Sequence, residues 1–207
     1  AQRGRSGRKI RNIVHNDANF RNYLVARLLF SFGGMAAGFV TVAAIRRWAV
    51  ADSQVGLFTA ALLVGQTLGN LAAGFIADRF GHRVSLIVGA GTGVVAYLIA
   101  WFAPAPAWYN LVFLLIGVGT GMAIVSGVLI NLEFSKAENR PTYVGIANTT
   151  MGIGSVTAPL LGGILATFSY NMLFALSAAC GVAALLTLWL VVNEPRNTTE
   201  YVAVSAD

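Results

Sequence analysis

GFIADRFGHR, residues 74–83, is the most informative segment of this chain. An apolar segment runs into Asp78 and Arg79, the chain turns at Gly81, and a second apolar segment follows Arg83. Only 11% of the 207 residues are charged, so a carboxylate and two guanidiniums within one short turn are unusual here. Their placement between two apolar segments indicates a loop with a function.

The composition around this loop predicts a membrane protein. Hydrophobic residues make up 57% of the chain and 23 residues are glycine, and a soluble domain of this size rarely avoids charge to this extent. The hydrocarbon core of a bilayer is about 30 Å thick and requires about 20 apolar residues per helix. The chain has six such stretches, separated by short polar breaks. Because a helix satisfies its own backbone polar groups in lipid, we expect an all-α membrane protein with six transmembrane helices.

The polar breaks also predict where the helices begin and end. Pro141 suits the first turn of the fifth helix. Gly34 with Gly38, and Gly65 with Gly69, have the four-residue spacing that lets membrane helices pack closely. The predicted helices cover about residues 20–48, 52–78, 83–102, 108–134, 141–168 and 171–192. The predicted regions are a basic cytoplasmic segment at 1–18, a transmembrane domain at 19–193 and a cytoplasmic tail at 194–207.

Membrane topology explains the net charge of +6 better than nucleic-acid binding does. Six crossings put both ends on one side, and all but two of the fourteen basic residues, Arg46 and Arg47, fall on that side. Because basic loops mark the cytoplasmic face, we expect both ends in the cytoplasm and the protein in the plasma (inner) membrane. The expected partner is the lipid bilayer and no nucleic acid. The residues on the predicted cytoplasmic side are Arg3, Arg5, Arg8, Lys9, Arg11, Arg21, Arg27, Arg79, Arg83, Lys136, Arg140 and Arg196.

The sequence contains no recognisable catalytic constellation and no pattern for a cofactor or a metal. Its two histidines, His15 and His82, lie far apart, and its one cysteine, Cys180, lies in an apolar helix. Two glycine runs, at 89–93 and 117–121, imitate dinucleotide-binding loops, but their spacing is wrong and no strand precedes them. We interpret these glycines as helix-packing residues and expect no enzymatic activity.

An internal repeat relates the two halves of the chain. A shift of 89 residues superposes Gly65 on Gly154 and Gly74 on Gly163, together with the Val-Gly pair at 55–56 on the pair at 144–145. Each repeat would contain three helices, so the second copy would be inverted in the membrane. We therefore predict an inverted three-plus-three repeat.

The loop at residues 74–83, here called the signature loop, resembles a known family signature. Gly74, Asp78, Arg79, Gly81 and Arg83, with His82 at a usually basic position, resemble the loop between the second and third helices of each half of the major facilitator superfamily. Together with the inverted repeat, the resemblance covers about residues 20–195 and implies half of a major facilitator fold, specifically the C-terminal six-helix half. The chain begins with Ala and lacks six further helices, so we expect a fragment or a processed piece.

The resemblance implies a function as well as a fold. It implies secondary active transport of a small-molecule solute by alternating access, with efflux as one of the directions it allows. The implied partner is the missing N-terminal six-helix half, or a second copy of the chain. The alternative is a non-transporting six-helix membrane scaffold or a degenerate half-transporter.

The resemblance also implies a gate at the signature loop. We expect Asp78 to accept hydrogen bonds from loop or helix N-terminal amides, and Glu133 to pair with Arg79 or Arg83. The family uses such a charge cluster to latch one conformation. The complete set of predicted gating residues is Gly74, Asp78, Arg79, Gly81, His82, Arg83 and Glu133.

Polar side chains within the second, fourth and fifth predicted helices indicate an interior cavity. Buried amides are costly in lipid unless they face protein or water, and the third and sixth helices have none in their middle thirds. For each residue, a hydrogen bond between helices is the alternative to a substrate contact. Arg27 either extends to the cytoplasmic interface or pairs with an acid inside the bundle. The cavity candidates are Gln66, Asn70, Ser126, Asn131, Asn148 and Ser155.

Overall fold

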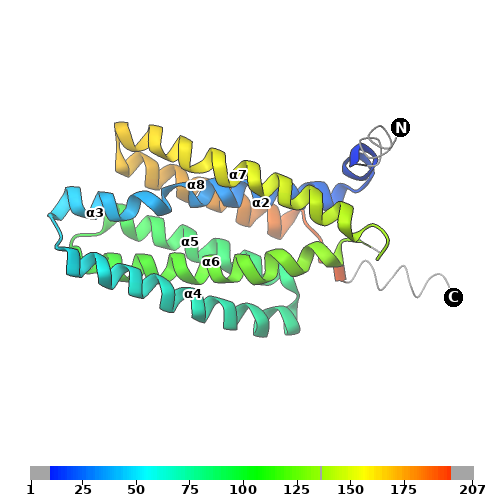
Figure 1. Ribbon diagram of the computed structural model, residues 1–207, viewed down its shortest axis with the longest axis horizontal. Helices are drawn as coiled ribbons and strands as arrows, with labels where there is room; N and C mark the ends of the chain where they lie inside the picture. The colour runs from blue at the N-terminus through cyan, green and yellow to red at the C-terminus, as the bar shows by residue number, and fades with distance from the viewer. Residues whose placement is uncertain (1–9, 136, 197–207) are drawn as a thin grey trace.

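Six apolar spans form an antiparallel helical bundle (Figure 1). The computed structural model describes residues 10–135 and 137–196, so the expectations for Lys136 and for residues 1–9 and 197–207 lie outside the described residues. Each span is long and apolar enough to cross a membrane. The spans are α2 (Ala18–Gly33) with η1 (Gly34–Phe39) and α3 (Val40–Trp48), then α4 (Asp52–Phe80), α5 (His82–Phe102), α6 (Trp108–Glu133), α7 (Arg140–Phe168) and α8 (Tyr170–Leu190).

The first span differs from the continuous helix that the sequence predicts. A 3₁₀ segment, η1, interrupts it at Gly34 and Gly38, and glycines weaken an α-helix at such a point. A Cβ added at either glycine would meet no atom within 4 Å, so no described helix of this chain packs closely on Gly34 or Gly38. Gly33 packs closely instead, because its Cβ would lie 3.2 Å from the backbone of Gly181 in α8.

The basic segment is also more regular than predicted, since residues 10–16 are helical. Asp17 separates this helix from α2 and caps α2, its carboxylate accepting a hydrogen bond from the Phe20 amide at 2.9 Å. The same carboxylate accepts a hydrogen bond from the Tyr143 hydroxyl at the start of α7, also at 2.9 Å. Asp17 therefore ties the beginning of the bundle to α7.

Helix packing follows the symmetry of the predicted repeat. The first helix of the second repeat, α6, packs against α4 and α5, the second and third helices of the first repeat. The first span, α2 with η1, packs in the same way against α7 and α8. The two third helices, α5 and α8, contact each other. Each three-helix group in space thus takes one helix from one repeat and two from the other, as an inverted three-plus-three arrangement requires.

Glycines allow α4 and α6 to approach until their backbones touch. A Cβ at Gly65 or Gly69 would collide with the backbone of α6 at Leu114 or Val118. Gly117 and Gly121 of α6 are equally close to the backbone of α4. The packing predicted from the four-residue spacing is therefore confirmed for α4, and the glycines at 117 and 121 serve as packing residues.

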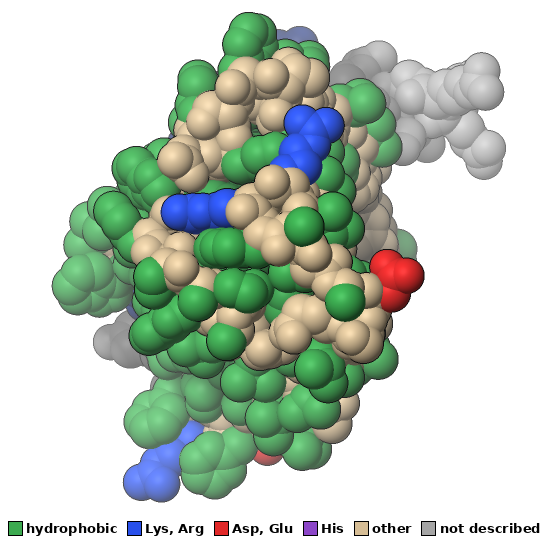
Figure 2. Space-filling model, turned by 90° about the vertical axis from the view of Figure 1, so that its left-hand side faces the viewer, with side chains coloured by type: hydrophobic (Ala, Val, Ile, Leu, Met, Phe, Trp, Pro, Cys, Tyr) green, Lys and Arg blue, Asp and Glu red, His purple; other side chains and the backbone are tan. Residues whose placement is uncertain are grey.

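The two ends of the bundle differ in charge. The start of α2 and the end of α8 lie at the same end in Figure 1, together with the start of α5 and the end of α4. The opposite end, which faces the viewer in Figure 2, is mostly hydrophobic and shows few charged side chains. The α3–α4 connection at that end follows Arg46 and Arg47, the two basic residues that the sequence assigns to this side.

Candidate functional site

Gly81 alone connects α4 to α5 and has a backbone that only glycine adopts readily. Its φ is 92° and its ψ is 160°, a region that is essentially restricted to glycine. A Cβ at Gly81 would also collide with the carboxylate of Glu194. The sharp turn and the close approach of Glu194 therefore both depend on the glycine in the signature loop.

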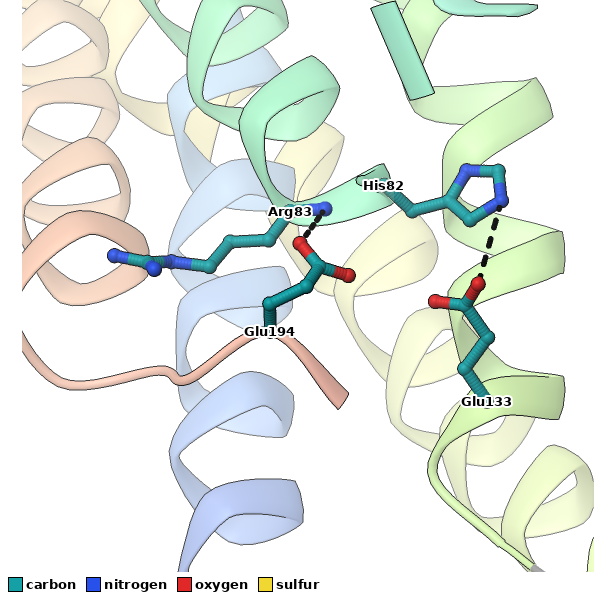
Figure 3. Close-up of polar contacts among 4 residues, drawn as sticks. All are labelled: His82, Arg83, Glu133 and Glu194. Carbon is teal, nitrogen blue, oxygen red and sulfur yellow. Dashed lines mark hydrogen bonds and ion pairs between the residues drawn. The ribbon is translucent and has the colours of Figure 1, made fainter. Parts of the chain in front are cut away.

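Glu194 caps the first turn of α5 from the far end of the chain (Figure 3). Its Oε2 accepts a hydrogen bond from the Arg83 amide at 3.1 Å, and the carboxylate also accepts one from the His82 amide. Free amides and the helix dipole make a helix N-terminus attractive to an anion. The sequence predicts that Asp78 accepts from such amides, but the carboxylate in that position is that of Glu194.

Arg83 makes the reciprocal contact at the end of α8. Its Nε donates to the Leu188 carbonyl at 2.7 Å, and its Nη2 donates to the Trp189 carbonyl. Carbonyls in the last turn of a helix carry partial negative charge and lack helical partners, so a guanidinium stabilises them. Arg83 and Glu194 together join the N-terminus of α5 to the C-terminus of α8.

Glu133 faces His82 rather than an arginine of the loop. Its Oε1 lies 3.9 Å from His82 Nε2, and Figure 3 shows the two side chains pointing toward each other. The predicted pairing of Glu133 with Arg79 or Arg83 is therefore wrong for the described residues. Arg83 is directed to α8 as described above, and the Arg79 guanidinium lies 5.5 Å from the centre of the Phe80 ring.

A pocket of about 480 Å³ brings part of the predicted gating set together. Two of its lining residues, Glu194 and Arg196, are outside the predicted gating set, although charges directly after the last apolar span were a signal that could have identified them. Gly74, another predicted member, lies one turn or more away and would have no atom within 4 Å of an added Cβ. The polar and turn residues lining the pocket are Asp78, Arg79, Gly81, Arg83, Glu194 and Arg196.

Two hydrogen bonds that were not predicted from the sequence hold the segment after α8 in place. The Asn193 amide donates to Asn19 Oδ1 at 2.7 Å, and Asn19 Nδ2 donates to the Asn193 carbonyl at 3.0 Å. This reciprocal pair fixes the chain immediately before Glu194. The position of the capping carboxylate is therefore determined by both the start of α2 and the end of α8.

The environment of Glu194 predicts a dependence of stability on pH. Burial raises the pKa of the Glu194 carboxyl, and the amide hydrogen bonds and the Arg83 charge offset only part of this effect. The folded state therefore holds the proton more tightly than the unfolded state. The resulting stabilisation is fully present below the usual glutamate pKa of 4.5, and it is lost as the pH rises through the higher folded-state pKa.

Glu194→Gln is expected to reduce this pH dependence, because the amide side chain still accepts hydrogen bonds but does not titrate. The measurement is the thermal unfolding midpoint between pH 5 and pH 7.5, followed by tryptophan fluorescence. Glu138→Gln, in the exposed connection between α6 and α7, is the matched control and should leave the pH dependence unchanged. An unchanged pH profile in Glu194→Gln would contradict the assignment.

A separate cavity of about 170 Å³ lies near the middle of the bundle. It is lined by residues near the midpoints of four spans, from both repeats. Tyr97, Thr120 and Ser177 contribute polar side chains, and glycines form much of the remaining wall. None of the six cavity candidates predicted from the sequence lines it. The complete lining is Phe30, Gly33, Gly34, Ala37, Gly89, Ala90, Gly93, Val94, Tyr97, Ile116, Gly119, Thr120, Ser177 and Gly181.

The six predicted cavity residues differ in burial and in their neighbours within this chain. Gln66 and Asn70 are half-buried on α4, and Asn70 Oδ1 would lie 3.0 Å from a Cβ at Gly121 of α6. Ser126 and Asn131 are buried in α6, where Asn131 Nδ2 donates to the Gly127 carbonyl at 2.8 Å. The remaining two candidates, Asn148 and Ser155, are exposed on α7.

Arg27 lies inside the bundle. Its side chain is only 6% exposed, so the guanidinium packs against other helices of the bundle and does not extend into solvent. One of the two sequence interpretations, a pair with an acid inside the bundle, is not realised, since no acid forms an ion pair with Arg27 among the residues that the structure describes.

Comparisons with known proteins are consistent with this architecture. The family model of the Major Facilitator Superfamily matches residues 23–204. The chain is 30% identical over 145 residues to a probable vesicular acetylcholine transporter-A of Danio rerio, covering 70% of this chain and 28% of the relative. It is 31% identical over 117 residues to a gentisate transporter of Corynebacterium glutamicum, covering 56% of this chain and 26% of the relative.

The fold also matches that of a solved transporter structure. The crystal structure of a D-xylose-proton symporter superposes with a TM-score of 0.68 at 17% sequence identity. The match covers 91% of this chain and 52% of the symporter, so the chain has the length of about half of that protein. It spans a little more than a quarter of the two curated relatives described above.

Proposed function

Because the chain belongs to the Major Facilitator Superfamily, we propose that it forms one six-helix half of a secondary transporter. This transporter moves a small-molecule solute across the membrane by alternating access. The observation that carries the proposal is the cavity near the middle of the bundle, bounded by helices from both inverted repeats. Transporters of this construction bind their solutes near the bilayer midplane at the repeat interface.

The other half of the transporter would pack against the exposed faces of α4 and α7. Helices α4 and α7 lie along the lower and upper edges in Figure 1 and expose large apolar side chains, among them Leu71 and Phe75 on α4 and Val156 and Leu160 on α7. The polar residues Asn148 and Ser155 are also exposed on α7. A second six-helix half, or a second copy of this chain, would cover part of this surface and enclose a solute pathway.

The charged end of the bundle would set the orientation of the transporter and contribute to its gating. The excess of basic residues at the end with the start of α2 and the end of α8 supports a cytoplasmic location for that end, in the plasma (inner) membrane. There, Glu194 and Arg83 join α5 to α8 beside the signature loop. Formation of these contacts in only one conformation would bias the transporter toward that conformation.

The names of the relatives do not select one solute, since they refer to acetylcholine and to gentisate. The names also do not indicate the direction of transport or the coupling ion. The class of solute must therefore be inferred from the side chains of this chain.

Cysteine accessibility in the complete protein tests the proposed pathway. In a background without other cysteines, residues introduced at Gln66, Asn70 and Asn148 should react with a membrane-impermeant thiol reagent, because these positions should face water between the halves. Introduced cysteines at Leu98 and Leu186 should stay unmodified, because these apolar, partly exposed positions on α5 and α8 should face lipid.

Alternating access predicts a further change in the same experiment. Addition of a transported solute should change the labelling rate at Asn148 but leave the rates at Leu98 and Leu186 unchanged. Uniform protection of all five cysteines would reject the water-filled pathway. Labelling that never responds to any solute taken up by the cells would reject alternating access.

A further inference from the structure

Arg27 is a buried cation in the apolar part of the bundle, and no described residue supplies a counter-ion for it. It is the tenth residue of α2, about 14 Å along the helix axis from the first residue. Its Nε and Nη1 are buried and have no hydrogen-bond acceptor among the residues that the structure describes. A buried guanidinium within a membrane span is costly without a partner, so such a residue is typical of a functional site.

The guanidinium packs against α6, but α6 supplies no hydrogen-bond acceptor for Nε or Nη1. A Cβ at Gly127 would lie 2.6 Å from Arg27 Nη2, so the guanidinium packs directly on this glycine. The Gly127 carbonyl already accepts hydrogen bonds from Asn131 Nδ2 at 2.8 Å and from the Tyr23 hydroxyl at 3.4 Å. The contact with α6 therefore fixes the position of the charge and leaves its donors available.

Phe30 connects Arg27 to the cavity near the middle of the bundle, although Arg27 itself is not one of the residues that line it. Arg27 Cζ is 5.7 Å from the centre of the Phe30 ring, and Phe30 lines the cavity together with Gly33 and Gly34. A solute in the cavity that extends along Phe30 toward the signature-loop end would approach the Arg27 donors.

No acidic side chain of the described chain neutralises this region. All six described acids are at helix ends or in connections, and a positive charge surrounded by apolar walls attracts anions strongly. These acids are Asp17, Asp52, Asp78, Glu133, Glu138 and Glu194.

We propose that Arg27 binds the carboxylate of a small organic anion whose apolar part occupies the cavity. This inference rests on the proposed transport function and assigns its substrate class. The planar guanidinium matches the geometry of a carboxylate and forms two parallel, charge-assisted hydrogen bonds with it. A cavity of about 170 Å³ is also large enough for an aromatic ring, since an apolar protein cavity of about 150 Å³ binds benzene.

Binding of benzoate and of its neutral analogue benzamide to the complete purified protein tests the proposal. Benzoate should bind at least about tenfold more tightly than benzamide, because a hydrogen-bonded charge pair is available only to the anion. Arg27→Gln should reduce benzoate binding to the level of benzamide, and Arg27→Lys should retain part of the preference. Arg21→Gln is the matched control, since Arg21 is exposed on the same helix and donates to the Val14 and His15 carbonyls.

Several outcomes would overturn the proposal. These are equal binding of benzoate and benzamide by the wild-type protein, no benzoate binding at all, and benzoate binding that survives in Arg27→Gln. The wild-type comparison decides the question even if Arg27→Gln does not fold. If the wild-type protein does not bind benzoate and Arg27→Gln fails to assemble, the results would instead indicate that Arg27 pairs with an acid from the other half.

The same protein in liposomes separates this inference from the proposed function. Uptake of a neutral sugar or an amine, without Arg27-dependent benzoate binding, would leave transport standing and reject the anion site. Arg27-dependent benzoate binding, without uptake of any solute and without solute-dependent cysteine labelling, would leave the anion site standing and reject transport.

Discussion

Gly81→Ala is expected to abolish most of the activity of the complete transporter. The backbone at Gly81, with φ 92° and ψ 160°, costs about 1–3 kcal/mol for a residue with a side chain. The new Cβ would also displace the Glu194 carboxylate from the first turn of α5, and losing a helix N-cap costs about 0.5–2 kcal/mol. Since about 1.4 kcal/mol changes a two-state ratio tenfold, uptake should fall by at least about tenfold.

Gly74→Ala is the matched control because it alters the other glycine of the same signature. Gly74 lies within α4, and an added Cβ would meet no atom within 4 Å. Uptake by Gly74→Ala should therefore stay close to that of the wild type, when normalised to the amount of protein in the membrane. Equal losses in the two variants, or wild-type uptake by Gly81→Ala, would contradict the assignment of Gly81 and Glu194.

Gly69→Leu is expected to have the largest effect on stability. A side chain at this position would collide with the backbone of Val118 in α6, which cannot move aside as a side-chain end can. Overpacking in a core costs about 1–3 kcal/mol and occasionally more, and a backbone obstacle places this variant at the upper end. The thermal unfolding midpoint and the yield of monodisperse protein in size-exclusion chromatography should both fall sharply.

Gly56→Leu provides the control for Gly69→Leu in the same helix. Gly56 is exposed near the start of α4, and an added Cβ would meet no atom within 4 Å. This variant should match the wild type in midpoint and yield. A stable, monodisperse Gly69→Leu protein would show that α4 and α6 do not need their close backbone contact.

The signature loop could be identified from the sequence, but the partners of its charged residues could not. The order of residues in the charged turn between two apolar spans was sufficient to identify the loop and its family resemblance. The partners of its charges were predicted incorrectly, because Glu194 occupies the place expected for Asp78 and His82 faces Glu133. Glu194 is 111 residues from Arg83 in sequence, so no local spacing relates the two residues.

The six spans, most of their ends and the inverted repeat could be predicted from the order of the residues alone. The thickness of a bilayer sets the length of an apolar span, and proline, glycine and charged residues mark the ends, so this information is local. Glycine spacing also predicted the contact between α4 and α6, because a helix brings residues four apart onto one face.

Which side chains face the interior of the bundle could not be predicted in this way, because it depends on how the helices pack together. Lipid is as apolar as the interior of a membrane protein, so hydrophobicity does not mark the inner face of a helix as it does in water. The burial of Arg27 against Gly127, the exposure of Asn148 and the composition of the cavity wall depend on how the helices are paired and rotated. Those rotations are fixed by contacts between residues that are distant in sequence. The pattern of residues within one span carries no information about such contacts.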